Sequence, residues 1–278
     1  MITDFETNTI YFSELLATDK RSSQTFAEIK KVFSEFDIQP KLLPKTKDIW
    51  ARDYMPIQVS DSYFIEYRYD PDYLQGNRKG YRDLKTYTDI VCDSIKLQTK
   101  KSDLIMDGGN CIKSSDCIIL TEKIIKENRL SYTRKELVKK LHETFQVEKV
   151  VLIPWNKQDR YGHADGMIRF INNETVLINY MYKNDSVLLY ILKKAGLEFC
   201  FLNLKKNTNN KINWAYLNFL QTKDIILFPK LGIEEDLESF EQLENYYSDY
   251  KGRIKQIDSI ALVKEGGALN CISWTIKM

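Results

Sequence analysis

The chain has 278 residues, of which 43% are hydrophobic and 29% are charged, and its formal net charge is only +2. This composition is typical of a globular protein with a sizeable core, and the near-neutral charge argues against a nucleic-acid or membrane partner. No stretch approaches the ~18 apolar residues that a membrane-spanning helix needs, and the first ten residues, MITDFETNTI, are not a signal peptide.

The first half of the chain alternates between strand-like and helix-like segments. In chain order we expect a strand at 10–12 (IYF), a helix with Phe26, Ile29, Val32, Phe33 and Phe36 on one face, a strand at 64–67 (FIEY), a weaker helix with Leu84, Val91 and Ile95, and a strand at 117–120 (CIIL).

The second half continues this alternation, and it begins with a capping box, TRKE at 133–136, which opens a helix. In chain order we expect that helix with Leu137, Val138, Leu141 and Phe145 inward, strands at 150–154 and 175–180, a helix with Val187, Leu188, Ile191 and Leu192 that stops near Gly196, strands at 199–202 and 225–229, and a helix with Leu237, Phe240, Leu243 and Tyr247. About five strand–helix–strand units follow one another without a linker, which favours one α/β domain built from a degenerate repeat.

The cysteines and histidines restrict the kinds of site that the chain can hold. Five cysteines are scattered along it, at Cys92, Cys111, Cys117, Cys200 and Cys271. This odd number, without a CxxC pair, indicates reduced thiols in a cytoplasmic protein. His142 and His163 are the only histidines, so there is no zinc-binding pattern.

Five short stretches have residue types that suggest chemistry. They are DIWARDYMP at 48–56, MDGGN at 106–110, YGHADGMIRF at 161–170, WAYLNF at 214–219 and GGALNC at 266–271. Each stretch contains one polar residue at an equivalent position, and successive ones are 54, 56, 55 and 53 residues apart. They are Asp53, Asp107, His163, Asn218 and Cys271. If each repeat is one unit around an axis, equivalent positions point to the same centre, so we expect these side chains to meet in one pocket.

These residue types suit an attack on a guanidinium group. A cysteine thiolate is a strong nucleophile once a neighbouring cation or hydrogen bonds lower its pKa, and a histidine can move protons. Paired carboxylates match the rigid fork of N–H donors that a guanidinium presents. His163 and Asp165 are expected on the same face of a strand. Singly, each motif also has a structural interpretation, such as a buried thiol at Cys271 or a plain turn at Gly266–Gly267; their matched spacing favours the functional one.

Together the motifs resemble those of the agmatine deiminase and bacterial peptidylarginine deiminase family. The matching motifs are W-x-R-D-x-x-P at Trp50–Pro56, D-G-G-N at Asp107–Asn110, H-x-D-x-x-x-R-F at His163–Phe170, Y-x-N at Tyr216–Asn218 and G-G-x-x-x-C at Gly266–Cys271. The resemblance implies one pentein catalytic domain over residues 1–278, with five ββαβ-type units around a pseudo-fivefold axis. It also implies hydrolysis of a guanidino group to a ureido group and ammonia, without a metal or organic cofactor.

The resemblance also implies roles for individual residues. Cys271 would be the nucleophile, His163 the general acid and base, and Asp53 and Asp165 the guanidinium-binding carboxylates, with a thiouronium intermediate on Cys271. Substrate-binding or site-shaping residues would be Trp50, Asp107, Asn110 and Asn218, together with Arg68, which, like Arg78 and Arg82, is a candidate for binding a substrate carboxylate. The chain departs from the family at Asn270, where His commonly precedes the nucleophile, and in residues 65–83, which lack a tryptophan-rich stretch. Agmatine, arginine and arginyl compounds therefore remain alternative substrates.

Three other functions are compatible with parts of this pattern. An amidinotransferase would share the fold and the intermediate but use an amine as acceptor, and a non-catalytic pentein-fold binding protein would need none of the catalytic residues. A papain-like hydrolase would use the same residue types, but the chain lacks a CGSCW-like stretch, and this function would leave Asp53 and Asp165 without a role. We expect a small guanidino compound as the partner, with no nucleic acid or membrane, in a cytoplasmic protein that is compatible with a homo-oligomer.

Overall fold

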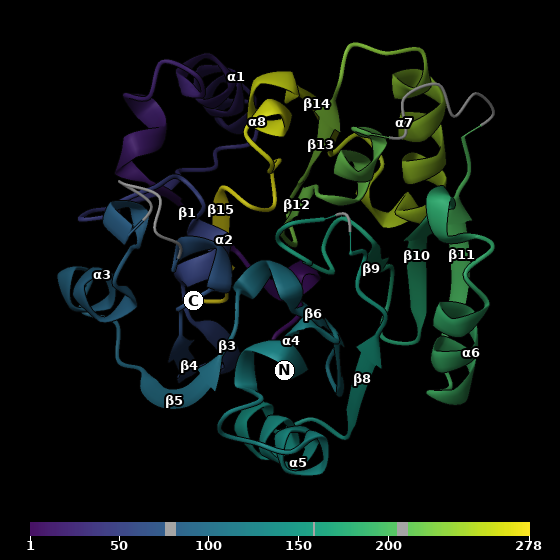
Figure 1. The fold of residues 1–278 in the computed structure, drawn as a ribbon. Coiled ribbons are helices and arrows are strands. Elements are labelled where there is room, and N and C mark those ends of the chain that lie inside the picture. Colours follow the sequence, from purple (N-terminus) through teal and green to yellow (C-terminus); the bar gives the residue numbers. More distant parts are fainter. Residues whose placement is uncertain (76–81, 158, 205–210) are drawn as a thin grey trace.

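The computed structural model describes the whole chain except residues 76–81, 158 and 205–210. Within the described residues, five three-stranded sheets lie around a common centre, and helices surround them (Figure 1). In every sheet the middle strand pairs antiparallel with one neighbour and parallel with the other. The predicted ββαβ-type units are therefore confirmed.

Each sheet consists of an antiparallel partner, a middle strand and a parallel partner. In this order they are β3 (Ile57–Ser60), β4 (Tyr63–Arg68) and β5 (Lys100–Ile105); β6 (Ile112–Lys113), β7 (Cys117–Thr121) and β8 (Lys149–Ile153); β9 (Ile168–Phe170), β10 (Thr175–Asn179) and β11 (Glu198–Leu202); β12 (Leu220–Gln221), β13 (Ile226–Lys230) and β14 (Ile254–Asp258); and β15 (Ser273–Ile276), β1 (Thr9–Ser13) and β2 (Lys41–Leu43).

The last of these sheets joins the two ends of the chain. β15 pairs antiparallel with β1, and Tyr11 lies opposite Trp274 in this pairing. The sequence suggested five units in a row, but the structure contains four continuous units and a fifth that is assembled from both termini. The pairing closes the ring.

Helices connect each middle strand to its parallel partner, because parallel pairing requires a crossover. The crossover helices are α1 (Ser23–Ser34), α3 (Thr88–Ser94), α4 (Lys123–Asn128) followed by α5 (Arg134–Phe145), α6 (Ser186–Lys194) and α7 (Glu235–Tyr246). The short helices α2 (Ala51–Tyr54) and α8 (Ile260–Lys264) lie between units. No helix in the described part of the chain has the length and apolar character that a membrane crossing requires.

Local sequence signals explain several helix ends. Thr133 and Glu136 form the predicted capping box at the start of α5, and α6 ends before Gly196, whose φ of +73° favours glycine. The predicted inward faces were wrong at Val187 and Leu237, which are exposed. Successive helical residues differ by about 100° in direction, so a face centred on the buried Leu188 turns Val187 outward.

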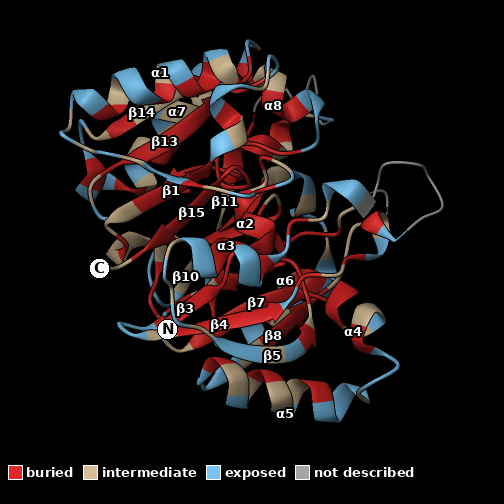
Figure 2. Ribbon diagram, turned by 90° about the vertical axis from the view of Figure 1, so that its left-hand side faces the viewer, coloured by how far each residue is buried: buried red, intermediate tan, exposed pale blue. Residues whose placement is uncertain are grey.

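The core lies between the strands and the inner faces of the helices. Figure 2 shows that most strands are buried, whereas α1 and α5 expose their outer sides. On α1, Phe26, Ile29 and Phe33 pack in one cluster with Phe12 of β1. Burial of each such side chain stabilises the fold by roughly 1.5–3 kcal/mol.

The fold places the five motifs at the centre of the ring. β3, β6, β9, β12 and β15 lie nearest the middle in Figure 1, and each motif ends at or just before one of these strands. The near-constant spacing in the sequence therefore corresponds to equivalent positions in the five units.

Candidate active site

His163 lies between two carboxylates at the centre of the ring. Its Nε2 donates to Asp107 Oδ2 at 2.9 Å, and its Nδ1 lies 3.7 Å from Asp53 Oδ1. Burial alone would lower the pKa of His163, but Asp53 and Asp107 outweigh burial and raise this pKa to about 10. The imidazole is therefore protonated near neutral pH and can donate a proton to a leaving group.

His163 and Asp165 do not lie on a strand, as the sequence suggested, but in the loop that precedes β9. The loop is fixed by backbone contacts: Tyr161 N and Gly162 N each donate to the Asp159 carboxylate at 2.9 Å. Asp165 N donates to Gly109 O at 3.1 Å. A loop can direct the two side chains to different partners, whereas a strand would present them side by side.

Lys123, on α4, forms a buried ion pair with Asp107. Its Nζ lies 3.2 Å from Asp107 Oδ2 and 2.9 Å from Glu127 Oε1, and its side chain is only 1% exposed. Burial raises the pKa of Asp107, but Lys123 and His163 lower it below its ordinary value. Sequence analysis missed Lys123, because an i,i+4 pair of lysine and glutamate is typical of an exposed helix face.

Asp53 and His163 approach the backbone of the Asp107–Asn110 motif closely. Gly109 N donates to Asp53 Oδ1 at 3.1 Å. A Cβ at Gly109 would lie 2.6 Å from His163 Nδ1 and 2.7 Å from Asp53 Oδ1, so only glycine fits. Burial raises the pKa of Asp53 to about 7, although the nearby His163 acts in the opposite direction.

Cys271 lies beside Asp165 on the other side of the site. Its Sγ donates to Asp165 Oδ2 at 3.6 Å, and its backbone N donates to Asn218 Oδ1 at 3.2 Å. Burial, together with Asp165 and Asp53, raises the pKa of the thiol well above its ordinary value. The free site therefore holds a thiol rather than a thiolate.

Asn270 orients Asp165. Its Nδ2 donates to Asp165 Oδ2 at 2.8 Å, and its backbone N donates to Asn218 O at 2.9 Å. The residue before the predicted nucleophile thus acts on a neighbouring carboxylate, which is a contact that no local sequence signal indicated.

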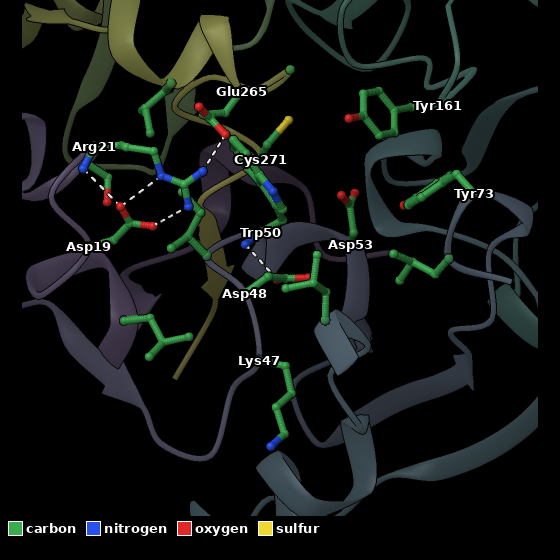
Figure 3. A pocket seen from close by; sticks show the side chains of 18 of the residues that line it. Asp19, Arg21, Lys47, Asp48, Trp50, Asp53, Tyr73, Tyr161, Glu265 and Cys271 are labelled. Carbon is green, nitrogen blue, oxygen red and sulfur yellow. Dashed lines mark hydrogen bonds and ion pairs between the residues drawn. The ribbon is translucent and has the colours of Figure 1, made fainter. Parts of the chain in front are cut away.

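A cavity of about 370 Å³ opens onto Cys271, His163 and Asp53. Figure 3 shows Cys271, Asp53, Tyr73 and Tyr161 around one space, with Trp50 behind the sulfur. Beside this space, Arg21 pairs with Asp19 at 2.7 Å and with Glu265 at 2.6 Å. Aromatic walls with a charged outer part suit an elongated ligand that has a polar distal end.

The Gly266–Gly267 pair shapes one wall of this cavity. Gly266 has a φ of +97°, which glycine adopts readily. A Cβ at Gly267 would lie 2.2 Å from Trp50 Cζ3, so the indole packs directly against the backbone there. The bend therefore brings Cys271 to the cavity and makes room for Trp50.

A second cavity, of about 340 Å³, reaches Cys271 and His163 from another side. Asp165 lines this second cavity, whereas Asp53 lines the first. The residues that line both are Tyr161, His163, Gly266 and Cys271. The thiol and the imidazole thus lie where the two spaces meet.

The other predicted substrate-binding residues lie behind or outside the cavities. Asn110 Oδ1 accepts from Thr121 N at 2.9 Å, and Asp107 and Asn218 support His163 and Cys271. Arg68 is a correction: it lies at the end of β4, lines neither cavity and pairs with Asp70 at 2.8 Å.

The cavities are described without the side chains of the two other arginine candidates. Arg78 lies outside the described residues, and only the backbone of Arg82 is described.

Within the described residues, no group of three or more His, Cys, Asp or Glu side chains could hold a metal ion.

Comparisons with known proteins agree with this geometry. The family model described as Porphyromonas-type peptidyl-arginine deiminase matches residues 2–276. A relative named putative agmatine deiminase 2, from Listeria monocytogenes, is 20% identical over 91% of this chain and 86% of its own length.

Solved structures are similar over the whole chain. The agmatine deiminase of C. jejuni has a TM-score of 0.76 and 18% identity, covering 100% of this chain and 95% of that chain. The agmatine deiminase of Enterococcus faecalis has a TM-score of 0.76 and 17% identity, covering 99% and 94%. The predicted pentein fold is confirmed.

Proposed function

Because the chain belongs to the Porphyromonas-type peptidyl-arginine deiminase family, we propose that it hydrolyses a guanidino group to a ureido group and ammonia, with Cys271 as the nucleophile. The observation that carries this proposal is the position of the Cys271 thiol, 3.6 Å from Asp165 and on the same cavity as Asp53 and His163. Two carboxylates, a protonated imidazole and a buried thiol are the groups that this reaction needs.

Binding would begin with the two carboxylates. Asp53 and Asp165 hold the planar guanidinium through paired, charge-assisted hydrogen bonds. The positive charge of the substrate lowers the pKa of the Cys271 thiol, whose pKa is raised in the free site by burial and by the same carboxylates. The proton leaves to solvent, and the thiolate forms only when a substrate is in place.

The chemical steps then use sulfur and imidazole in turn. The thiolate forms a bond to the guanidinium carbon, and the C–N bond to ammonia breaks as His163 gives its proton to the leaving nitrogen. The neutral imidazole next takes a proton from water, the hydroxide attacks the carbon of the thiouronium, and the C–S bond breaks. Well-oriented reactants can lower the barrier by roughly 7–11 kcal/mol.

We propose a small guanidine as the substrate. Cys271 is only 6% exposed and lines the first cavity together with Trp50 and Tyr73, which suits a slender ligand better than the arginine of a folded protein. Agmatine is the first candidate, because the relatives are named agmatine deiminases. Trp50 and Tyr73 would flank its methylene chain.

We further propose that residues 1–278 act as one catalytic domain, because β1 and β15 join the two ends of the chain beside the nucleophile. The active site would then form only when the whole ring has folded. We place the enzyme in the reducing cytoplasm, since all five cysteines are free thiols.

A substrate panel tests the function. Purified protein would be incubated with agmatine, arginine and arginyl peptides, and both ammonia and the ureido product would be measured. We expect equal amounts of the two products from at least one compound. Cys271→Ala should lower the rate at least ~10³-fold, as removal of a nucleophile does in other enzymes, while Cys200→Ala, at a half-buried thiol outside both cavities, serves as the matched control. Inactivity of the wild-type protein across the panel would refute the proposal.

A further inference from the structure

Tyr161 and Gly266 lie between the two cavities, since both residues line each of them. A Cβ at Gly266 would lie 2.9 Å from Tyr161 Cε2, so the tyrosine ring packs directly against the Gly266 backbone. The ring of Tyr161 also lies edge-on to Tyr73, with centroids 5.0 Å apart. Two compartments therefore adjoin the same thiol, and each has its own walls.

The two guanidinium-binding carboxylates belong to different compartments. Asp53 lines the first cavity and Asp165 lines the second. A planar cation that contacts both must lie at the junction, beside Cys271. If the substrate chain extends past Trp50 in the first cavity, the nitrogen that Asp165 holds faces the second cavity.

The second cavity is much larger than the group that an unsubstituted guanidine would place there. Ammonia is similar in size to water, which takes about 30 Å³ in the liquid, whereas this cavity measures about 340 Å³. Its walls combine apolar and aromatic side chains, from Met167, Met181, Tyr182 and Trp214, with the polar side chains of Asn156, Asp159 and Lys211. The apolar part of this lining suits an organic substituent.

We propose that this second cavity accepts an alkyl or aryl substituent on the guanidino nitrogen remote from the substrate chain, so that the enzyme also hydrolyses Nω-substituted guanidines and expels a substituted amine in place of ammonia. This inference rests on the proposed function. The sulfur–carbon bond forms as before, the bond from carbon to the substituted nitrogen breaks, and His163 supplies the proton to the departing amine. Water then releases the same ureido product, so the net reaction consumes one water and yields one alkylammonium ion.

The test compares agmatine with its Nω-methyl, Nω-propyl and Nω-benzyl derivatives. We expect kcat/KM for at least the propyl or benzyl compound to lie within tenfold of that for agmatine, with amine and ureido product released in equal amounts. A larger deficit for both compounds, or release of ammonia from them, would overturn this inference while leaving the proposed function intact. Absence of turnover of every compound would overturn this inference and agmatine as the substrate, and the proposed function itself would be overturned only if arginine and arginyl peptides were inactive as well.

A pair of variants locates the substituent. Met181 lines the second cavity and Leu84 the first, and both side chains are partly exposed, so either tolerates enlargement. In Met181→Trp, the ratio of kcat/KM for the benzyl compound to that for agmatine should fall at least tenfold, since a misfit of this size in an apolar pocket costs 10-fold to 200-fold. Leu84→Trp should leave the ratio within about twofold of wild type. Met181→Ala, which enlarges the second cavity, should raise the ratio or leave it unchanged. If the ratio falls in Leu84→Trp but not in Met181→Trp, the substituent lies in the first cavity, and the inference is overturned.

Discussion

Lys123 Nζ lies 3.2 Å from Asp107 Oδ2, and neither side chain is more than 1% exposed. The same oxygen of Asp107 accepts the hydrogen bond from His163 Nε2. A buried cation on a crossover helix thus acts on the imidazole at the centre of the ring through a single carboxylate.

Removal of this cation should change the pH dependence of catalysis. In Lys123→Met, Asp107 loses the cation that shares its Oδ2, so the pKa of Asp107 should rise. The carboxylate, still ionised at alkaline pH, then pairs with the imidazolium alone, and the pKa of His163 should rise as well. The alkaline limb of the kcat/KM profile should therefore move to higher pH. Loss of a buried ion partner also destabilises proteins by roughly 3–5 kcal/mol. Lys126→Met removes an exposed lysine of the same helix, which pairs with Asp72, and should leave both the profile and the melting temperature close to wild type.

The pKa of His163 predicts a specific loss of stability at high pH. It is about 10 in the folded protein, against an ordinary value of 6.5. The folded state therefore holds this proton more tightly, and the resulting stabilisation is complete below pH 6.5 and disappears as the pH rises to 10. Urea unfolding between pH 7.5 and 9.5 avoids most of the titration of Asp53, whose pKa is about 7. Over this range wild type should lose more free energy of unfolding than His163→Asn, by roughly 2–3 kcal/mol. Parallel curves would contradict a pKa of about 10 for His163.

Gly109 should be essential for activity rather than for folding. Gly109→Ala places a Cβ within 2.7 Å of both Asp53 Oδ1 and His163 Nδ1, and these two groups must move apart. We expect kcat/KM to fall at least tenfold, since displacements of about 1 Å near reacting groups cost up to ~100-fold. Gly196→Ala is the opposite case: it has no neighbour within 4 Å but a φ of +73°. It should lower stability by ~1–2 kcal/mol and leave the kinetics unchanged.

Two substitutions at Asn270 should distinguish the loss of its hydrogen bond to Asp165 from the effect of an added negative charge. Asn270→Ala removes the 2.8 Å hydrogen bond to Asp165 Oδ2 and should raise KM moderately. Asn270→Asp removes the same hydrogen bond and also places a second carboxylate against Asp165, so repulsion between the two charges should displace Asp165 from the position in which it binds the substrate. KM should therefore rise more in the aspartate variant than in the alanine variant. Equal effects of the two would indicate that Asn270 acts on packing alone.

Cys271 should react selectively with cationic reagents. Its raised pKa leaves little thiolate in the free site, so a neutral haloacetamide should label it slowly. A haloacetamidine carries a charge that Asp53 and Asp165 can hold, and it should lower the pKa of the thiol as a substrate does. We expect the rate ratio of cationic to neutral reagent to be at least tenfold higher at Cys271 than at Cys200, measured by mass spectrometry of labelled peptides; equal ratios would argue against a guanidinium-binding site.

The sequence predicted the repeat and the central motifs because both depend on local patterns. Apolar runs located all five middle strands, and the capping box located the start of α5. Equivalent positions in the repeat then brought Asp53, His163 and Cys271 to one cavity. Antiparallel partners such as β6 and β12, which have two residues each, are too short to give a periodic signal.

Features that depend on long-range packing were not predictable. Arg68 looked suited to a substrate carboxylate, but it lines neither cavity and pairs with Asp70. Lys123 looked like an exposed helical lysine, although it is buried beneath the site. The second cavity depends on the packing of Tyr161 against Gly266. These residues lie in loops far apart in the chain, and the sequence around neither one indicates the contact.

Pairing of β1 with β15 has a consequence for the newly synthesised protein. Cys271 is two residues from β15, whose partner β1 was made first, at the other end of the chain. The sheet that holds Cys271 in place therefore cannot form until residues 273–276 have been made, after every strand of the other four sheets. Contacts of such wide sequence separation also form slowly. The reactive sulfur is thus brought into position after the rest of the ring can already surround it.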